Sequence, residues 1–455
     1  MVRLSKHSPL PRAFLSLSVF LTILILSILS ACAKPTRRDA FTSVRGNAGD
    51  TRLTSLGSRP AGAYARSLNV TSTSSIFTWY SKTPRNESDA ESAFIIIHGV
   101  KRNAGTYWTI LNNAWAKARD ASFGSARPNS IRVAPLFFST NEDAGVYNSS
   151  QLGWADSNAW TVGEASTNPP DSSVSSFSVL DMLLNRFSNT NAYPNMKYIT
   201  FVAHGGGAQM LQRYAVLGGS NSVSSQISLR FVIGDPSSAL YFTRDRPVGV
   251  DQSSCPLWND YRYGINNYTS NYGLLNSLGA PTLFKAYANK QVRYVVGLND
   301  TQIQNGDQTC MAHAVGGQLR RNRSLAYWKY IHLLAGQGGK GLENFPGSFP
   351  SLNPQQSGNK TNFQNNNTSN IPRSSYSVAN KFKGVEIKHT LTVVQGAGHS
   401  ASKVYSSTVG RYALFADQAN SGGGTVPDFS NELIGYTADA AGAKSYDDGD
   451  DGDDD

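Results

Sequence analysis

The sequence predicts an α/β fold with a mostly parallel central sheet flanked by helices. Short apolar runs alternate with segments of helix length, which is the pattern of βαβ units. Most of these runs end in Gly or Asp, as strands do at the edge of a sheet where ligands bind. The chain has 455 residues, 40% of them hydrophobic, so it can bury a large core.

Six runs rich in β-branched and aromatic residues are the expected buried strands. They cover residues 93–99, 131–138, 198–203, 229–235, 292–300 and 389–399. Helices are expected at 174–187 and 207–217, where apolar residues recur with helical spacing. The stretch 338–383 is rich in Gly, Pro, Asn and Ser and has no such period, so we expect a flexible insertion there.

The two ends of the chain differ from this core. Residues 1–33 combine a basic start with a long apolar run and small residues, which predicts a secretory signal. The run is also long enough to remain as a membrane anchor, and its end, LSAC, resembles a lipoprotein box. We expect a polar linker or arm at 34–75, the folded domain at 76–436 and an acidic disordered tail at 437–455.

Composition favours a secreted protein, with membrane anchoring as the alternative if the signal stays uncleaved. With Cys32 in the signal, Cys255 and Cys310 form an even pair, so one disulfide is expected, and two free thiols are the alternative. Neither cysteine has zinc-site spacing, and no metal or other cofactor is predicted. The net charge of +10 comes without an aromatic–basic cluster, which argues against nucleic-acid binding. Sequons that permit glycosylation start at Asn69, Asn86, Asn148, Asn267, Asn299, Asn322, Asn359, Asn366 and Asn367.

The main candidate site lies in the segment YITFVAHGGGAQMLQRYAVLGG, from Tyr198 to Gly219. A strand-like run breaks at glycines and a helix-like run follows at once, which is how a nucleophile elbow is built. In the elbow pattern G-x-S-x-G the nucleophile position falls on Gly205. Small residues at 203 and 207 suit the sharp turn, but no Ser, Cys or Asp stands between them.

Other segments occur in a fixed order around this elbow, over about residues 76–435. They are IHGVKRNAGTYW, VAPLFF, GWADSNAW, VSSFSVLDMLL and, after the elbow, QRYA. In both type and order these segments resemble the α/β-hydrolase fold and a branch of secreted fungal and bacterial serine-hydrolase-like proteins. The resemblance implies a catalytic site in which the nucleophilic Ser is replaced by Gly205.

The resemblance also implies where the other catalytic groups lie. The acid is expected at Asp300, with Asp235 as the alternative, and the base at His399 in the loop after the last strand. A turn-capping role is the competing interpretation of Asp300. The backbone amides of Val100 and Gly206 are the expected oxyanion donors.

Four further residues are candidates for the binding region. His98 and Gly99 close a strand as the oxyanion loop does. His204 and Trp154 lie near the site in the sequence pattern, although packing in the core explains both. Ser400, in GHSAS, does not qualify as the nucleophile, because the fold places a His after the nucleophile and none follows residue 399.

These observations predict a secreted α/β-hydrolase-fold pseudoenzyme, because glycine has no side chain with which to attack a carbonyl carbon. The expected ligand is an unknown small-molecule ester, glycan or protein. One alternative is an active esterase- or lipase-like hydrolase that uses His399 with another nucleophile or an activated water. The other is a cell-surface structural or adhesion protein, suggested by the basic body, the insertion and the acidic tail.

Overall fold

The computed structural model describes residues 42–46, 49–218, 223–270, 272–273, 275–338, 341–352, 380–417 and 425–439. The predicted signal, most of the predicted insertion and nearly all of the predicted acidic tail lie outside the described residues. No helix within these described ranges is long and apolar enough to cross a membrane.

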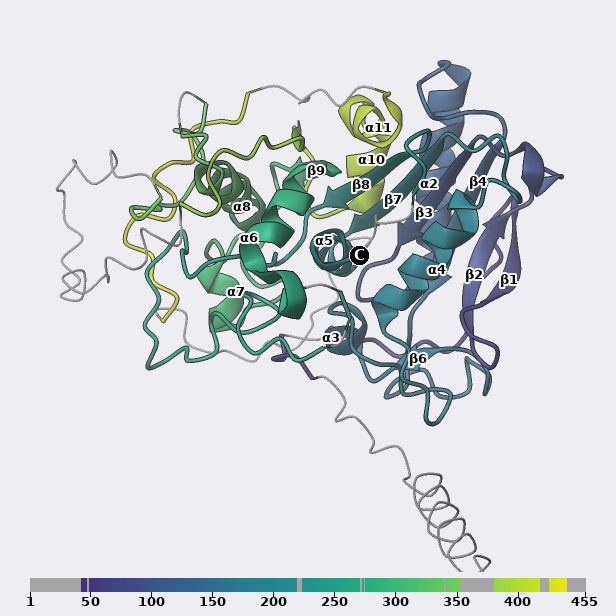
Figure 1. The fold of residues 1–455 in the computed structure, drawn as a ribbon, viewed down its shortest axis with the longest axis horizontal. Helices are drawn as coiled ribbons and strands as arrows, with labels where there is room; N and C mark the ends of the chain where they lie inside the picture. The colour runs from purple at the N-terminus through teal and green to yellow at the C-terminus, as the bar shows by residue number, and fades with distance from the viewer. Residues whose placement is uncertain are drawn as a thin grey trace, which may run out of the picture. The chain divides into compact units, whose positions relative to one another are not determined.

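An eight-stranded sheet forms the centre of the protein (Figure 1). In spatial order its strands are β1 (Ala63–Asn69), β2 (Ser75–Ser81), β4 (Ser130–Leu136), β3 (Ser92–Ile97), β7 (Tyr198–His204), β8 (Ser228–Gly234), β9 (Gln291–Gly297) and β10 (Thr390–Val394). β2 pairs antiparallel with β1 and β4, whereas the strands from β4 to β10 all run parallel. The predicted α/β-hydrolase fold, with its mostly parallel sheet, is therefore confirmed.

Helices cover both faces of this sheet (Figure 1). One face packs against α2 (Ala104–Asp120), α10 (Ala401–Ser406) and α11 (Thr408–Phe415). The other packs against α4 (Ser176–Ser188), α5 (Gly206–Leu217), α6 (Leu275–Ala288) and α8 (Arg320–Leu334). Short elements complete the described chain: η1 (Glu87–Asp89), β5 (Phe138–Ser139), β6 (Gly153–Trp154), α3 (Ser157–Trp160) and α7 (Cys310–Ala314).

Alternate residues of the central strands belong to two hydrophobic cores, one on each face of the sheet. In β3, Phe94 and Ile96 join the core under α2, while Ile95 and Ile97 join the core under α5. Side chains of successive strand residues point to opposite faces, and a strand covered by helices on both sides is apolar throughout. This explains why the central strands could be predicted from unbroken apolar runs.

Strand β1 lies within residues 34–75, for which the sequence predicts a linker or arm. Its residues pair with β2 along the full length of both strands. Only Ala63 and Leu68 of β1 are buried, because an edge strand with one solvated face needs few apolar residues. The polar composition of this segment predicts a linker, whereas the structure contains a regular edge strand.

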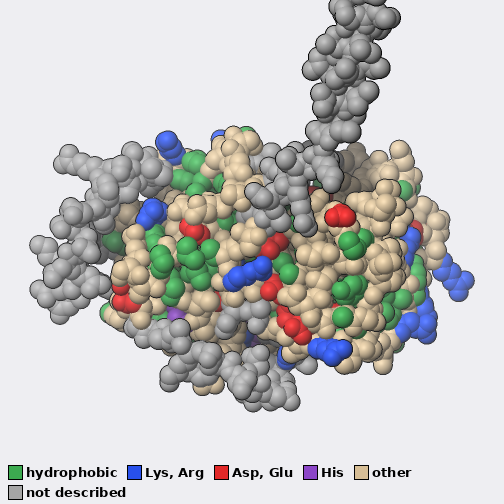
Figure 2. Space-filling view, turned by 90° about the horizontal axis from the view of Figure 1, so that it is seen from below, with side chains coloured by type: hydrophobic (Ala, Val, Ile, Leu, Met, Phe, Trp, Pro, Cys, Tyr) green, Lys and Arg blue, Asp and Glu red, His purple; other side chains and the backbone are tan. Residues whose placement is uncertain are grey.

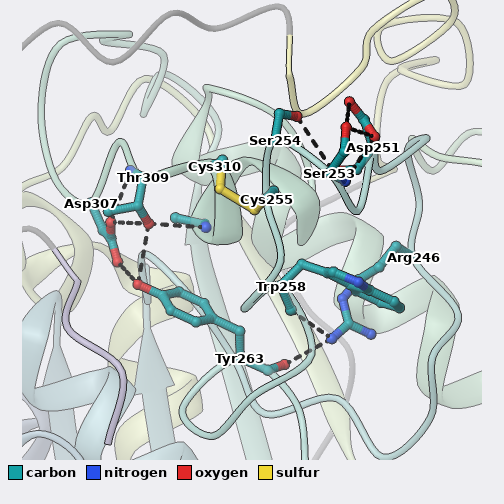
Figure 3. Close-up of a disulfide and its surroundings, with 11 residues drawn as sticks. Arg246, Asp251, Ser253, Ser254, Cys255, Trp258, Tyr263, Asp307, Thr309 and Cys310 are labelled. Carbon is teal, nitrogen blue, oxygen red and sulfur yellow. Dashed lines mark hydrogen bonds between the residues drawn. A yellow bond between two sulfur atoms is a disulfide. The ribbon is translucent and has the colours of Figure 1, made fainter.

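Cys255 and Cys310 are joined by the disulfide that the sequence predicts (Figure 3). The bond ties the loop after β8 to the start of α7. Nearby, the Tyr263 hydroxyl donates to Asp307, and Asp307 Oδ1 accepts from the Thr309 amide at 3.1 Å and its hydroxyl at 2.8 Å. The bond between Tyr263 and Asp307 connects the same two loops a second time.

The sequons differ in exposure. Asn69, Asn86, Asn148, Asn267 and Asn299 are exposed. In contrast, Asn322 lies within α8, is only 1% exposed and donates to Oε2 of Glu432 at 2.6 Å. A glycan on Asn322 would require this helix to leave the core, so we exclude that sequon.

Candidate active site

The elbow connects β7 to α5. β7 ends at His204, α5 begins at Gly206, and Gly205 between them has φ 58° and ψ −122°. A residue with a Cβ is strained in this conformation, whereas glycine adopts it readily. The amide of Gly205 donates to the carbonyl of Gly234 at 3.0 Å. The segment therefore has the backbone of a nucleophile elbow and carries no side chain at its tip.

Close packing behind the tip requires the next two glycines. A Cβ atom on Gly207 would lie 2.5 Å from the carbonyl oxygen of His98, and one on Gly206 would lie 2.8 Å from Cγ1 of Val100. The Gly206 Cβ position is also 3.2 Å from the amide nitrogen of Val100. The structure thus brings together Val100 and Gly206, the two residues expected to supply oxyanion donors.

The expected base and acid meet at the carboxyl ends of β9 and β10. Nδ1 of His399 lies 2.8 Å from Oδ2 of Asp300, and both residues are buried, with exposed fractions of 4% and 1%. Since β9 and β10 are parallel neighbours, the loops that follow them emerge at the same edge of the sheet. His399 is thus paired with Asp300, the first of the two expected acids.

Arg320, at the start of α8, is a member of this site that sequence reasoning missed. Its Nε and Nη2 atoms each lie 3.0 Å from Oδ1 of Asp300. Burial raises the pKa of Asp300, but the charges and hydrogen bonds of His399 and Arg320 outweigh burial and hold that pKa below its ordinary value. Asp300 is therefore ionised at neutral pH and orients His399 through the Nδ1 proton.

Asp235 is hydrogen-bonded to a second histidine of this region, His204. Its Oδ2 atom lies 3.2 Å from Nε2 of His204, and its Oδ1 atom accepts from the Gly297 amide at 2.9 Å. The ring centroid of His204 is 4.6 Å from that of His399. His204 is thus a packed, hydrogen-bonded residue, as expected, but it also belongs to the site.

The structure places His98 in the interior, where both ring nitrogens bond to backbone. Nε2 accepts from the Phe137 amide at 3.0 Å, so Nδ1 carries the proton and donates to the carbonyl of Gly99 at 2.8 Å. Burial lowers the pKa of His98 to about 4. We conclude that His98 fixes the loop at Gly99 and does not face a ligand.

Trp154 also packs in the core and does not line a binding surface. It has no exposed area, its Nε1 donates to the carbonyl of Glu164 at 3.1 Å, and its ring centroid lies 5.2 Å from that of Phe137. Trp160 stacks on the same Phe137 ring at 5.5 Å. The two tryptophans therefore belong to one aromatic cluster below the loop that contains Val100.

Arg102 holds the loop of Val100 in place. Arg102 has φ 56°, and its guanidinium donates to the carbonyl of Val100 at 3.0 Å. Two bonds of 2.9 and 2.8 Å join it to the Asp143 carboxylate, and Asp50 lies 3.1 Å away. Both ends of the Arg102–Asp143 ion pair are fully buried. Nothing in the local sequence marked Arg102, because its partners come from distant segments.

The N-terminal arm, residues 42–46 and 49–56, lies against this loop. Asp50 accepts from the Ser157 amide at 2.9 Å in addition to pairing with Arg102. A Cβ atom on Gly49 would lie 3.4 Å from Cγ2 of Val100. Val100 is therefore packed between the arm and the elbow.

Surface charge is mixed on the face shown in Figure 2. There, the Lys and Arg side chains of the described residues lie scattered among acidic, apolar and other groups. Among the described residues on that face, neither basic nor acidic side chains form a large patch.

Comparison with known proteins found no matching family model and no matching curated protein. Among solved structures, poly(aspartic acid) hydrolase-1 from Sphingomonas sp. KT-1 is 16% identical, with a TM-score of 0.47 over 78% of this chain and 98% of the other. A poly(3-hydroxybutyrate) depolymerase from Bordetella parapertussis is 13% identical, with a TM-score of 0.46; the match covers 75% of this chain and 86% of the other. A siderophore hydrolase from Aspergillus nidulans is 12% identical, with a TM-score of 0.35; the match covers 79% of this chain and 97% of the other. The fold assignment rests on the strand order and the elbow described above.

Proposed function

We propose that the protein is a secreted α/β-hydrolase-fold pseudoenzyme that binds an ester, glycan or protein ligand at its former catalytic site. The observation that carries this proposal is Gly205 at the tip of an intact elbow, with φ 58° and ψ −122°. The base and the acid remain paired beside it, 2.8 Å apart. Only the attacking group is absent from the arrangement.

The missing hydroxyl decides against ordinary acyl transfer. His399 can accept a proton, but glycine has no hydroxyl or thiol from which to remove one. In subtilisin, a case used to calibrate such losses, removal of the nucleophilic Ser costs about 10⁶ in turnover. The remaining acceleration of roughly 10³–10⁴ over water comes from the oxyanion hole and binding.

Two features support secretion. Residues 1–33 have the composition of a secretory signal. The disulfide between Cys255 and Cys310 fits an oxidising compartment, where such bonds form and persist. N-terminal sequencing of the protein from culture medium tests this part. A mature N-terminus near Ala31 or Ala33 is expected, and retention of the whole chain in the membrane fraction would contradict it.

An assay on short p-nitrophenyl esters tests the absence of catalysis. We expect the wild-type protein and His399→Ala to hydrolyse p-nitrophenyl butyrate at the same background rate. Calorimetric titration with the unreacted ester then measures binding by the wild-type protein. Wild-type turnover that disappears in His399→Ala would contradict the pseudoenzyme and support the alternative of an active hydrolase.

A further inference from the structure

His204, Asp235 and His399 form a compact buried group at the carboxyl edge of the sheet, which we call the His–Asp–His cluster. One nitrogen or oxygen atom of each lies within 4.8 Å of the corresponding atoms of the other two. His204 ends β7, Asp235 follows β8, and His399 lies in the loop after β10. The exposed fractions of the three residues are 0%, 0% and 4%.

Two imidazoles and one carboxylate are a donor set suited to zinc. Catalytic zinc sites use three protein ligands of this kind and keep a fourth position for water or substrate. Imidazole nitrogen also suits copper, iron and nickel, whereas calcium and magnesium prefer sites made of oxygen atoms. The donor atoms of the His–Asp–His cluster therefore favour a divalent transition-metal ion.

One of the distances within the cluster already matches the separation that such an ion requires. With bonds of about 2.0–2.1 Å, ligand atoms in a tetrahedral site lie about 3.3 Å apart. Nε2 of His204 and Oδ2 of Asp235 already lie 3.2 Å apart. The widest separation in the cluster is at most 4.8 Å, up to about 1.5 Å more than in a tetrahedral site, so metal binding would have to draw His399 toward the other two side chains.

A second set of hydrogen bonds orients two of these three side chains, His399 and Asp235. Asp300 accepts from Nδ1 of His399, so Nε2 is the nitrogen that would bind the ion. The Gly297 amide bonds to Oδ1 of Asp235 at 2.9 Å, which directs Oδ2 toward His204. Metal-binding histidines usually donate their other ring N–H to a carboxylate in this way.

The charges around the cluster also favour a cation. Asp235 and Asp300 bring two carboxylates to this region, whereas Arg320 brings one guanidinium, 3.0 Å from Asp300. Buried carboxylates are stabilised when they are paired or coordinate a metal ion. A bound dication would therefore compensate the excess negative charge.

From this geometry we infer that His204, Asp235 and His399 bind a divalent transition-metal ion, zinc in the first place. The sequence predicts no metal site, because the three residues lie far apart in the chain and form no short motif. Metal binding here is independent of whether the protein hydrolyses an ester, since it requires no nucleophile at residue 205.

Cobalt substitution tests the site on the intact secreted protein. The protein is treated with a chelator, equilibrated with Co²⁺ and then examined for cobalt content and for the visible absorption of four-coordinate Co²⁺. We expect one cobalt per chain, displaced by Zn²⁺. The variants His204→Gln and Asp235→Asn should lose more than about 100-fold in affinity, and Asp300→Asn about 10–100-fold, the usual loss for an outer-shell carboxylate.

His332→Gln is the matched control. His332 lies on α8 with its Nδ1 atom bonded to the Trp328 carbonyl, outside the cluster, so cobalt binding should be unchanged. If the cluster variants fail to fold, X-ray absorption spectroscopy at the zinc edge is measured on the wild-type protein instead. A scattering contribution from two imidazole ligands would support the site. The inference is overturned if the wild-type protein holds no stoichiometric metal, if folded His204→Gln binds cobalt as tightly as the wild type, or if no imidazole lies near the zinc.

Discussion

Nδ1 of His399 lies 2.8 Å from Oδ2 of Asp300 in the interior of the protein, beside an elbow whose tip is Gly205. In a catalytic triad a His–Asp pair orients a base toward a nucleophile, and residue 205 has no side chain to supply one. The proposed pseudoenzyme therefore differs from such a triad at residue 205, while the turn, the helix behind it and the His399–Asp300 pair are present. Each of these parts leads to a measurable consequence.

Substitution of Gly205 should destabilise the protein. The φ of 58° with ψ of −122° costs a residue with a Cβ about 1–3 kcal/mol. Gly205→Ala and Gly205→Ser should therefore lower the free energy of unfolding by similar amounts in urea titrations. A gain in stability in either variant would show that the elbow is not strained.

Loss of Asp143 should be far more damaging than loss of a surface ion pair. Arg102 and Asp143 are both fully buried, so Asp143→Ala leaves the guanidinium paired with Asp50 and removes the acceptor of the Leu53 and Ser139 amides. We expect a cost of about 3 kcal/mol, the lower end of the range for breaking a buried ion pair. The matched control is Asp120→Ala, which breaks the exposed Arg119–Asp120 pair and should cost less than about 1 kcal/mol. Equal losses of unfolding free energy in the two variants would contradict the conclusion that the Arg102–Asp143 pair holds the loop of Val100 in place.

Stability should fall as the pH drops from about 6.5 toward 4. Burial lowers the pKa of His98 and His313 to about 4 and that of His389 to about 3. In the unfolded chain these histidines titrate near 6.5, so below that pH the unfolded state binds protons that the folded state does not. Each histidine then contributes a slope of up to about 1.4 kcal/mol per pH unit.

Urea titrations at several pH values measure this slope. His389→Gln should flatten the dependence between pH 6.5 and 4, because it removes one of the histidines whose pKa is lowered by burial. A free energy of unfolding that stays constant over this range would show that these histidines are protonated in the folded protein.

Removal of the disulfide should cost several kcal/mol. The bond between Cys255 and Cys310 closes a loop with a sequence separation of 55 residues. The chain-entropy relation gives about 4 kcal/mol for a loop of this length. The double variant Cys255→Ala/Cys310→Ala, compared with the oxidised wild type, should show this loss in its unfolding free energy. No loss would mean that the hydrogen bonds between Tyr263, Asp307 and Thr309 suffice to hold the two loops.

The central strands and the elbow could be predicted because local sequence determines them. Strands such as β3 and β7 are buried on both faces and are therefore continuous apolar runs. The elbow needs small residues at fixed positions, and these glycines are visible in the sequence. The resemblance to the α/β-hydrolase pattern then predicted His399 as the base and Asp300 as the acid, with Asp235 as the alternative acid.

Other parts of the site depend on contacts between distant segments and left no local pattern. Arg320 was one of several arginines in QLRRNRS, and only the fold shows that it contacts Asp300. The pairing of Asp235 with His204 likewise follows from the adjacency of β7 and β8. The edge strand β1 was not predicted from the sequence, because a strand with one solvated face can have a polar sequence.

The most direct test of the central claim is covalent labelling with a fluorophosphonate, followed by intact-mass and peptide mass spectrometry. The reagent phosphonylates an activated serine hydroxyl and releases fluoride. The reaction is run on chelator-treated protein, so that Nε2 of His399 holds no metal ion and can act as a base. The account predicts that the wild-type protein and Gly205→Ala stay unlabelled, while Gly205→Ser gains one adduct, at residue 205, that is lost when His399→Ala is added. Labelling of the wild-type protein that depends on His399 would contradict the account, because it would reveal a working nucleophile elsewhere in the site.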